Sequence, residues 1–225
     1  MEIRFLGQSC FELVEGDARV LIDPFLTGNP KAAVEAGDLE PTHILLTHGH
    51  ADHYGDTVEI ARRTGALVAA VPELANEIAG KGVENVVDPN LGGTIELPGG
   101  WSRWVPAWHT AVTADGTPHI SAGLVIRLGD TTVYHLGDTC LFSDLALPGQ
   151  RDELDVALIN IGGHYTMDRH DAVKAVELVG APTVIPCHYD TFQPIETDAE
   201  AFKVDVEAMT SSSVVILEPG EVHRA

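Results

Sequence analysis

Short apolar runs alternate with amphipathic stretches along this chain. Eight runs rich in Val, Ile and Leu are typical of buried strands: RVLID (19–23), HILLT (43–47), ALVAAV (66–71), LVIRL (124–128), TVYHL (132–136), VALINI (156–161), TVIPC (183–187) and VVIL (214–217). Four stretches have the residue types and boundaries of helices: 55–65, 72–82, 168–180 and 198–209. Gly65 suits the end of the first helix, and Pro72 suits the first turn of the second.

The order of these elements predicts the architecture. A strand-rich start leads into a strand–helix–strand–helix segment, and the same sequence of elements then repeats. We therefore expect two related halves, each a mixed sheet with helices on its outer face. Packed face to face, the halves form a four-layer αβ/βα sandwich, an α/β fold in a single domain over residues 1–225.

Composition narrows the class of partner. The chain has 13 Lys and Arg against 34 Asp and Glu, a formal net charge of −21, and 44% of its residues are hydrophobic. Such a surface repels polyanions, so we expect a small-molecule substrate and neither nucleic acid nor membrane as partner. There is no long apolar run and no signal-peptide pattern, so we expect a cytoplasmic protein with reduced cysteines; a homo-oligomer is left open.

Histidine and aspartate gather where apolar runs end. The segment LLTHGHADHYGD places three histidines within six residues. Four apolar runs stop at a group that can bind metal: His48, His109, Asp138 and His188. Because functional groups of mixed α/β folds collect in loops just past strand ends, we expect these side chains to converge.

The converging groups predict two metal ions. The predicted ligands of the first ion are His48, His50 and His109. Those of the second are Asp52, His53 and His188. Asp138, with two carboxylate oxygens, is predicted to bridge the two. This nitrogen and oxygen set suits two divalent ions, with Zn²⁺ as the preferred assignment and Mn²⁺ or Fe²⁺ as alternatives.

Several motifs give the chain a family resemblance. THGHADH (47–53) resembles the signature motif of the metallo-β-lactamase superfamily, and further segments resemble its small metal-dependent hydrolases: GQSCF (7–11), LIDPFL (21–26), YHLGDT (134–139), GGHYTM (162–167) and IPCHYDTF (185–192). The resemblance implies the αββα fold and the seven ligands above. It also marks a departure, since members of that branch often have His where this chain has Gln8.

These features predict a metal-dependent hydrolase. In this hypothesis a hydroxide held by the dinuclear site cleaves a small ester, lactone or phosphodiester, with Asp52 and Asp138 as the catalytic carboxylates. One alternative is a nucleic-acid phosphodiesterase, which the acidic composition disfavours. The other is a metal-binding regulatory protein without turnover.

Four further residues are predicted to serve the site. Asp23 and His135 are expected to hold the outer nitrogens of the ligand histidines; their alternatives are a turn before Pro24 and a buried core histidine. His164 and Tyr165 are expected to contact substrate, with an ordinary loop as the alternative.

Overall fold

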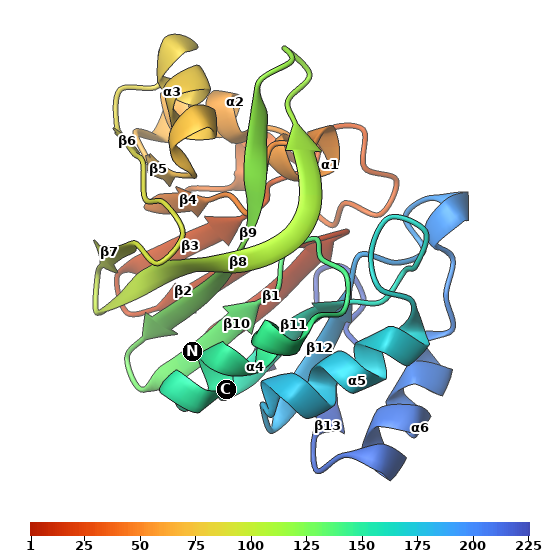
Figure 1. The fold of residues 1–225 in the computed structure, drawn as a ribbon. Helices are drawn as coiled ribbons and strands as arrows, with labels where there is room; N and C mark the ends of the chain where they lie inside the picture. The colour runs from red at the N-terminus through yellow and green to blue at the C-terminus, as the bar shows by residue number, and fades with distance from the viewer.

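Two facing β-sheets with helices on both outer faces make up the computed structural model, which describes residues 1–225 (Figure 1). Each sheet has seven strands. This arrangement confirms the predicted four-layer sandwich. A shared apolar core lies between the sheets, where Ile22 and Ile44 of one sheet belong to the same buried cluster as Trp104 and Ile126 of the other.

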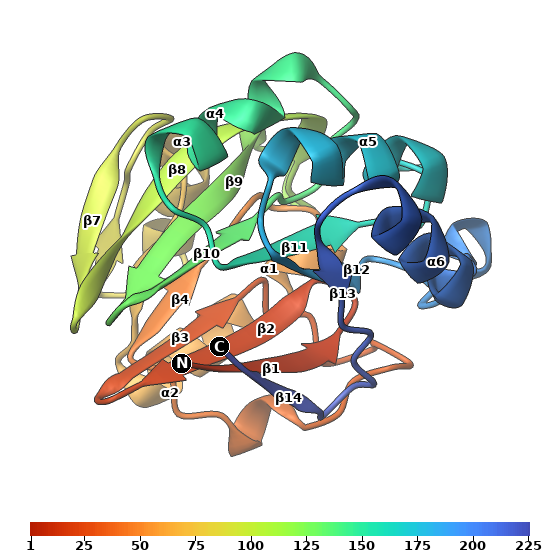
Figure 2. The same cartoon turned by 90° about the horizontal axis from the view of Figure 1, so that it is seen from below.

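The first sheet has the strand order β14-β1-β2-β3-β4-β5-β6. Its strands are β1 (Glu2–Gly7), β2 (Cys10–Glu15), β3 (Ala18–Ile22), β4 (His43–Leu45), β5 (Leu67–Ala69), β6 (Val86–Val87) and β14 (Val222–Arg224). The pairs from β3 to β6 are parallel, whereas β14, β1, β2 and β3 pair antiparallel. Figure 2 shows β14, the last strand of the chain, beside β1, with the two termini adjacent.

The second sheet repeats this mixed pattern in the order β13-β12-β11-β10-β9-β8-β7. Its strands are β7 (Thr94–Leu97), β8 (Gly100–Val112), β9 (Pro118–Leu128), β10 (Thr131–His135), β11 (Val156–Asn160), β12 (Thr183–Cys187) and β13 (Ser213–Val214). The pairs from β10 to β13 are parallel, and β7 to β10 pair antiparallel.

The helices cover the outer faces. The first sheet is covered by α2 (Thr57–Thr64) and α3 (Pro72–Gly80), and the second by α4 (Ala146–Arg151), α5 (Arg169–Val179) and α6 (Ala199–Met209) (Figure 1). Short helical turns occupy four loops: α1 (Ala51–Tyr54), η1 (Ala36–Asp38), η2 (Ser143–Leu145) and η3 (Gln193–Ile195). All four predicted helices are present. None of the helices has both the length and the apolar character needed to span a bilayer.

Candidate metal centre

The loop after β4 supplies four side chains to one edge of the sandwich. His48 and His50 precede α1, where His50 has extended backbone angles, and the single turn of α1 then presents Asp52 and His53. Gly55 ends that turn with φ of 38°, and a Cβ at this position would lie 2.2 Å from the carbonyl oxygen of Pro24. Only glycine fits here, so the turn that aims both residues inward depends on it.

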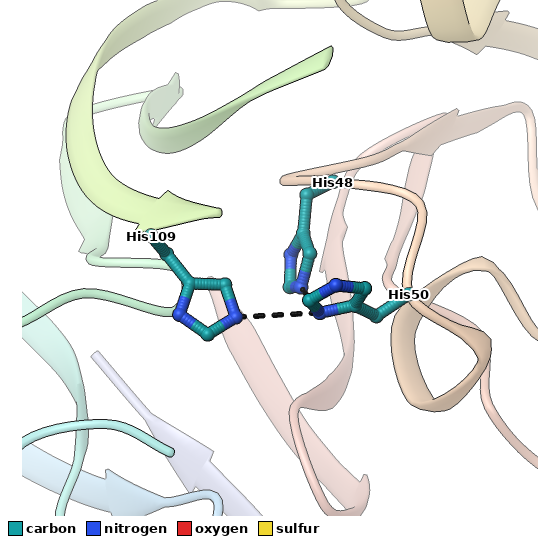
Figure 3. A group of neighbouring side chains, drawn as sticks. All are labelled: His48, His50 and His109. Carbon is teal, nitrogen blue, oxygen red and sulfur yellow. Dashed lines mark hydrogen bonds between the residues drawn. The ribbon is translucent and has the colours of Figure 1, made fainter. Parts of the chain in front are cut away.

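Three histidines from both sheets form a first cluster (Figure 3). His48 Nε2 lies 3.1 Å from His50 Nδ1, which lies 3.3 Å from Nε2 of His109 on β8. All three can offer a ligand atom within 4.8 Å of the others. Lone pairs that face one another in this way repel unless a proton or a cation lies between them.

A second cluster adjoins the first. Asp52, His53 and His188 can also offer ligand atoms within 4.8 Å of one another. Asp138 lies between the clusters: its Oδ1 is 3.3 Å from His53 Nε2, and its Oδ2 is 3.2 Å from His188 Nε2 and 3.6 Å from His109 Nε2. The structure thus brings together all seven side chains singled out in the sequence. Their role as ligands is a prediction that this geometry supports.

Asp23 fixes the orientation of two of these imidazoles. Its Oδ2 lies 2.7 Å from His53 Nδ1 and accepts a 2.6 Å hydrogen bond from the Thr47 hydroxyl, whose oxygen lies 3.0 Å from His48 Nδ1. Both rings therefore carry an N–H on Nδ1 and turn their Nε2 atoms into the centre. Asp23 thus contacts the outer nitrogen of a predicted ligand histidine, His53, as expected. Through the Thr47 hydroxyl it also orients a second one, His48.

Buried atoms without partners show that the centre fits metal ions. His53 Nε2, Asp138 Oδ1 and His188 Nε2 are buried and have no hydrogen-bond partner. Buried polar atoms are nearly always satisfied, and a cluster of orphaned nitrogen and oxygen donors has the composition of a zinc site. The residues present therefore suit divalent metal ions.

The two clusters hold different charge when no ion is bound. Burial lowers the pKa of His48 well below 6.5, and it lowers those of His50 and His109, so the first cluster is neutral. Burial acts the same way on His188, but the Asp138 carboxylate outweighs it and raises that pKa to about 9. Asp138 likewise holds the pKa of His53 above its usual value.

A β-bulge places His109, contrary to the expectation that it follows a strand. His109 lies inside β8, where the register with β9 shifts between Pro106 and Thr110. Within the bulge the Trp108 N–H donates to the hydroxyl of Thr139 over 3.0 Å, and the Trp108 carbonyl accepts from Cys140 N–H. Pro106 has no N–H to donate to β9, and the regular pairing of β8 with β9 is interrupted after it. In the interruption β8 bonds instead to the loop that carries Asp138.

Comparison with known proteins identifies the family. A model of the beta-lactamase superfamily domain matches residues 2–188. The chain is 48% identical over 229 residues to a metal-dependent hydrolase of Methanopyrus kandleri, with 98% of both chains covered. It is 45% identical over 225 residues to a metal-dependent hydrolase of Thermus thermophilus, covering 100% of this chain and 99% of the relative.

Solved structures agree with this assignment. Igni18, described as a novel metallo hydrolase from the hyperthermophilic archaeon Ignicoccus hospitalis, matches with a TM-score of 0.90 at 35% identity over 99% of this chain and 97% of that one. The chain belongs to the metallo-β-lactamase superfamily.

Gln8 serves the centre of this metallo-β-lactamase superfamily member in a way that the sequence left open. It is buried, with φ of 57°, at the end of β1. Its side-chain Nε2 donates a 2.9 Å hydrogen bond to Asp52 Oδ2, and its backbone carbonyl accepts a 2.8 Å hydrogen bond from the backbone N–H of His188. Gln8 therefore holds one predicted ligand, Asp52, by its side chain and another, His188, by its backbone.

His119 is a second supporting residue that sequence reasoning missed. Its Nε2 accepts a 2.8 Å hydrogen bond from the N–H of Gly49, which lies between His48 and His50. Its Nδ1 lies 3.1 Å from the Thr117 carbonyl and so carries the proton. A Cβ on Gly49 would lie 2.9 Å from the His119 ring, so close contact requires glycine. This contact spans 70 residues, and no local pattern signals it.

Two further residues, His135 and His164, lie elsewhere than expected. His135 is buried, but its Nε2 lies 3.2 Å from the Ser9 carbonyl and its Nδ1 accepts from Gly137 N–H, so it holds backbone rather than a ligand histidine. His164 is exposed with φ of 52° and does not line the cavity over the centre. Its ring packs edge-on against Tyr165, which does line that cavity. Both differences arise because a residue's place near a strand end does not specify which surface its side chain meets.

Proposed function

We propose that this metal-dependent hydrolase binds two divalent ions, with Zn²⁺ as the preferred metal, and hydrolyses a small ester, lactone or phosphodiester. His48, His50 and His109 would hold one ion. Asp52, His53 and His188 would hold the other, with Asp138 between them. The observation that carries this proposal is the convergence of seven such groups, three of which (His53, Asp138 and His188) have buried inner atoms without a hydrogen-bond partner.

Bound ions would supply a water of lowered pKa and polarise the oxygen of the attacked group. The protein residues supply the rest. Asp23 fixes the N–H of His53 on Nδ1 and, through Thr47, that of His48, so that Nε2 of each ring is the atom that would face an ion. Asp52, at the cavity wall with its Oδ2 fixed by Gln8, is placed to take a proton from water and return it to the leaving oxygen.

The cavity favours small molecules over nucleic acid. It has a volume of about 640 Å³, and no Lys or Arg lines it. Proteins that bind nucleic acid neutralise several phosphates with such residues, and this chain carries a net charge of −21. We therefore rank a nucleic-acid phosphodiesterase second. An open cavity above the proposed ligands also disfavours a regulatory protein without turnover, because a structural site needs no open position.

Metal analysis and kinetics together test the proposal. The purified chain, stripped with chelator and reloaded with Zn²⁺ or Mn²⁺, should hold two ions per chain by inductively coupled plasma mass spectrometry. It should then hydrolyse 4-nitrophenyl acetate or bis(4-nitrophenyl) phosphate at a rate that chelator abolishes. One ion per chain would refute the dinuclear assignment, and a fully loaded chain inert to both compounds would favour the regulatory alternative.

A further inference from the structure

The cavity over the metal centre has two unlike walls. One wall is formed by the proposed ligands. Apart from Thr110 of β8, the rest is apolar or aromatic, and it comes from loops of both halves: Phe25, Ala51, Tyr165, Phe192 and Pro194. At about 640 Å³ the cavity lies in the usual range for small-molecule sites, roughly 300–1,000 Å³.

Aromatic rings of this wall are exposed. Phe192 is 38% exposed and Tyr165 is 56% exposed, although both line the cavity. The rings of Phe25 and Phe192 face each other with centroids 6.3 Å apart and planes at 32°. Exposed aromatic surface gathered around a cavity marks a place where an apolar group of a ligand is buried.

The loops that carry these rings are held in place. Oδ2 of Asp56 accepts hydrogen bonds from the N–H groups of Leu26 and Thr27, of 3.0 and 2.8 Å, next to Phe25. On the other side Asp190, at φ of 57°, accepts from the Thr197 N–H over 2.8 Å and so closes the loop around Phe192. The part of the wall that Phe25 and Phe192 form is thus in place before a ligand arrives, which lowers the cost of binding.

Charge selects against anionic ligands. None of the 11 residues that line the cavity is Lys or Arg, and Asp52 and Asp138 are among them. A substrate with a carboxylate away from its reacting group would find no cation on the aromatic wall. Burying that charge without a partner is unfavourable.

From these observations we infer that the substrate is an uncharged ester or lactone whose apolar acyl group lies against Phe25, Phe192 and Tyr165. The inference rests on the proposed function and narrows its substrate class to uncharged esters and lactones, so that phosphodiesters are excluded. In the reaction the water oxygen bonds to the acyl carbon, and the bond from that carbon to the alkoxy oxygen breaks. The proton lost by water passes to the departing alkoxide.

A matched pair of substrates tests the inference. 4-Nitrophenyl hexanoate and the mono-4-nitrophenyl ester of adipic acid share the leaving group and the six-carbon acyl chain, but only the second ends in a carboxylate. The Zn²⁺-loaded chain should give a kcat/KM at least tenfold higher for the hexanoate. An equal or higher value for the adipate would overturn the inference.

Variants of Phe192 test the wall itself. Phe192→Ala should raise KM for the hexanoate about tenfold with little change in kcat, whereas Phe192→Leu, which keeps an apolar side chain, should stay within threefold of wild type. Phe192→Arg should raise kcat/KM for the adipate and lower it for the hexanoate. Val204→Ala, which changes a 66% exposed side chain on α6, is the matched control. Unchanged KM in Phe192→Ala would contradict the inference.

A binding measurement without metal separates this inference from the proposed function. Fluorine NMR of 4-fluorobenzyl alcohol should show binding to the metal-free chain that weakens at least fivefold in Phe192→Ala. No binding, or equal binding by the variant, would overturn the apolar site. A loaded chain that cleaves bis(4-nitrophenyl) phosphate but neither ester would overturn the substrate class alone. A loaded chain inert to all three would refute the proposed function.

Discussion

The side chain of Gln8 donates a 2.9 Å hydrogen bond to Oδ2 of Asp52, a residue 44 positions further along the chain. Through this bond the end of β1 fixes a carboxylate on the loop after β4. Groups that orient metal ligands matter nearly as much as the ligands, because a ligand free to rotate binds its ion more weakly.

Replacing Gln8 should therefore weaken binding of the ion proposed at Asp52, His53 and His188. We expect Gln8→Ala to lower Zn²⁺ affinity there by about 10–100-fold, the usual loss when such a partner is removed. Gln8→His, which restores a ring donor, should recover most of that affinity. Competition with a chromophoric chelator measures both, and Gln150→Ala on the exposed face of α4 is the control. Equal affinities in Gln8→Ala and wild type would show that Asp52 needs no support.

Removing Asp138 should affect both ions. We expect Asp138→Ala to hold at most one ion per chain and to lose more activity than the roughly 10–100-fold that removal of a supporting partner costs. The exposed Asp144 lies nearby in sequence, so Asp144→Ala serves as control and should keep two ions and wild-type turnover. Normal metal content and rate in Asp138→Ala would disprove a bridging role.

The contact between His119 and Gly49 gives a prediction on stability. His119→Ala leaves the partly buried Gly49 N–H without its acceptor, which should lower the free energy of unfolding by about 1–3 kcal/mol. The same variant should also weaken binding of the ion proposed at His48, His50 and His109, because His48 and His50 flank the Gly49 N–H. Urea denaturation and metal titration measure the two effects. His170→Ala, at an exposed position on α5, should change neither.

Metal uptake should release protons. Without metal the raised pKa values of His53 and His188 keep both rings charged at neutral pH, whereas the first cluster is neutral. Calorimetry of Zn²⁺ binding at pH 7 in buffers of different ionisation enthalpy should show net proton release, and the share from His188 should vanish above its pKa of about 9. Release that does not depend on pH would contradict these charge states.

The same shifts set the pH dependence of the metal-free chain. A histidine whose folded pKa is raised stabilises the fold fully below its unfolded value of about 6.5, and this contribution is lost as pH rises through the folded value. For His188 the loss should fall between about pH 6.5 and about 9. Thermal melting in chelator across this range measures it, and a melting temperature that rises with pH would refute the assignment.

Much of the fold and of the site could be predicted from local sequence. Val, Ile and Leu runs marked the strands that precede His48, Asp138 and His188, and a strand end is a local feature that a sequence shows directly. The position of His109 could not be predicted in the same way. It depends on a bulge in β8 that pairs with Thr139, and that pairing forms only in three dimensions.

Supporting residues were harder to predict than ligands. Gln8 and His119 act through hydrogen bonds to residues 44 and 70 positions away, so neither has a neighbour in sequence that reveals its role. His135 shows the reverse error. Its place three residues before Asp138 suggested a contact with a ligand histidine, but its Nε2 lies against the backbone carbonyl of Ser9.

The division of the ligands between the two sheets also has a mechanical consequence. His48, His50, Asp52 and His53 lie on the segment that follows β4 of the first sheet. His109 lies on β8 of the second sheet, and Asp138 and His188 follow its strands β10 and β12. The three cysteines are free, so no covalent cross-link joins these halves. Bound ions, with ligands from both halves, would act as a cross-link between them at this edge of the sandwich. Metal supply would then set resistance to heat and proteases as well as catalysis.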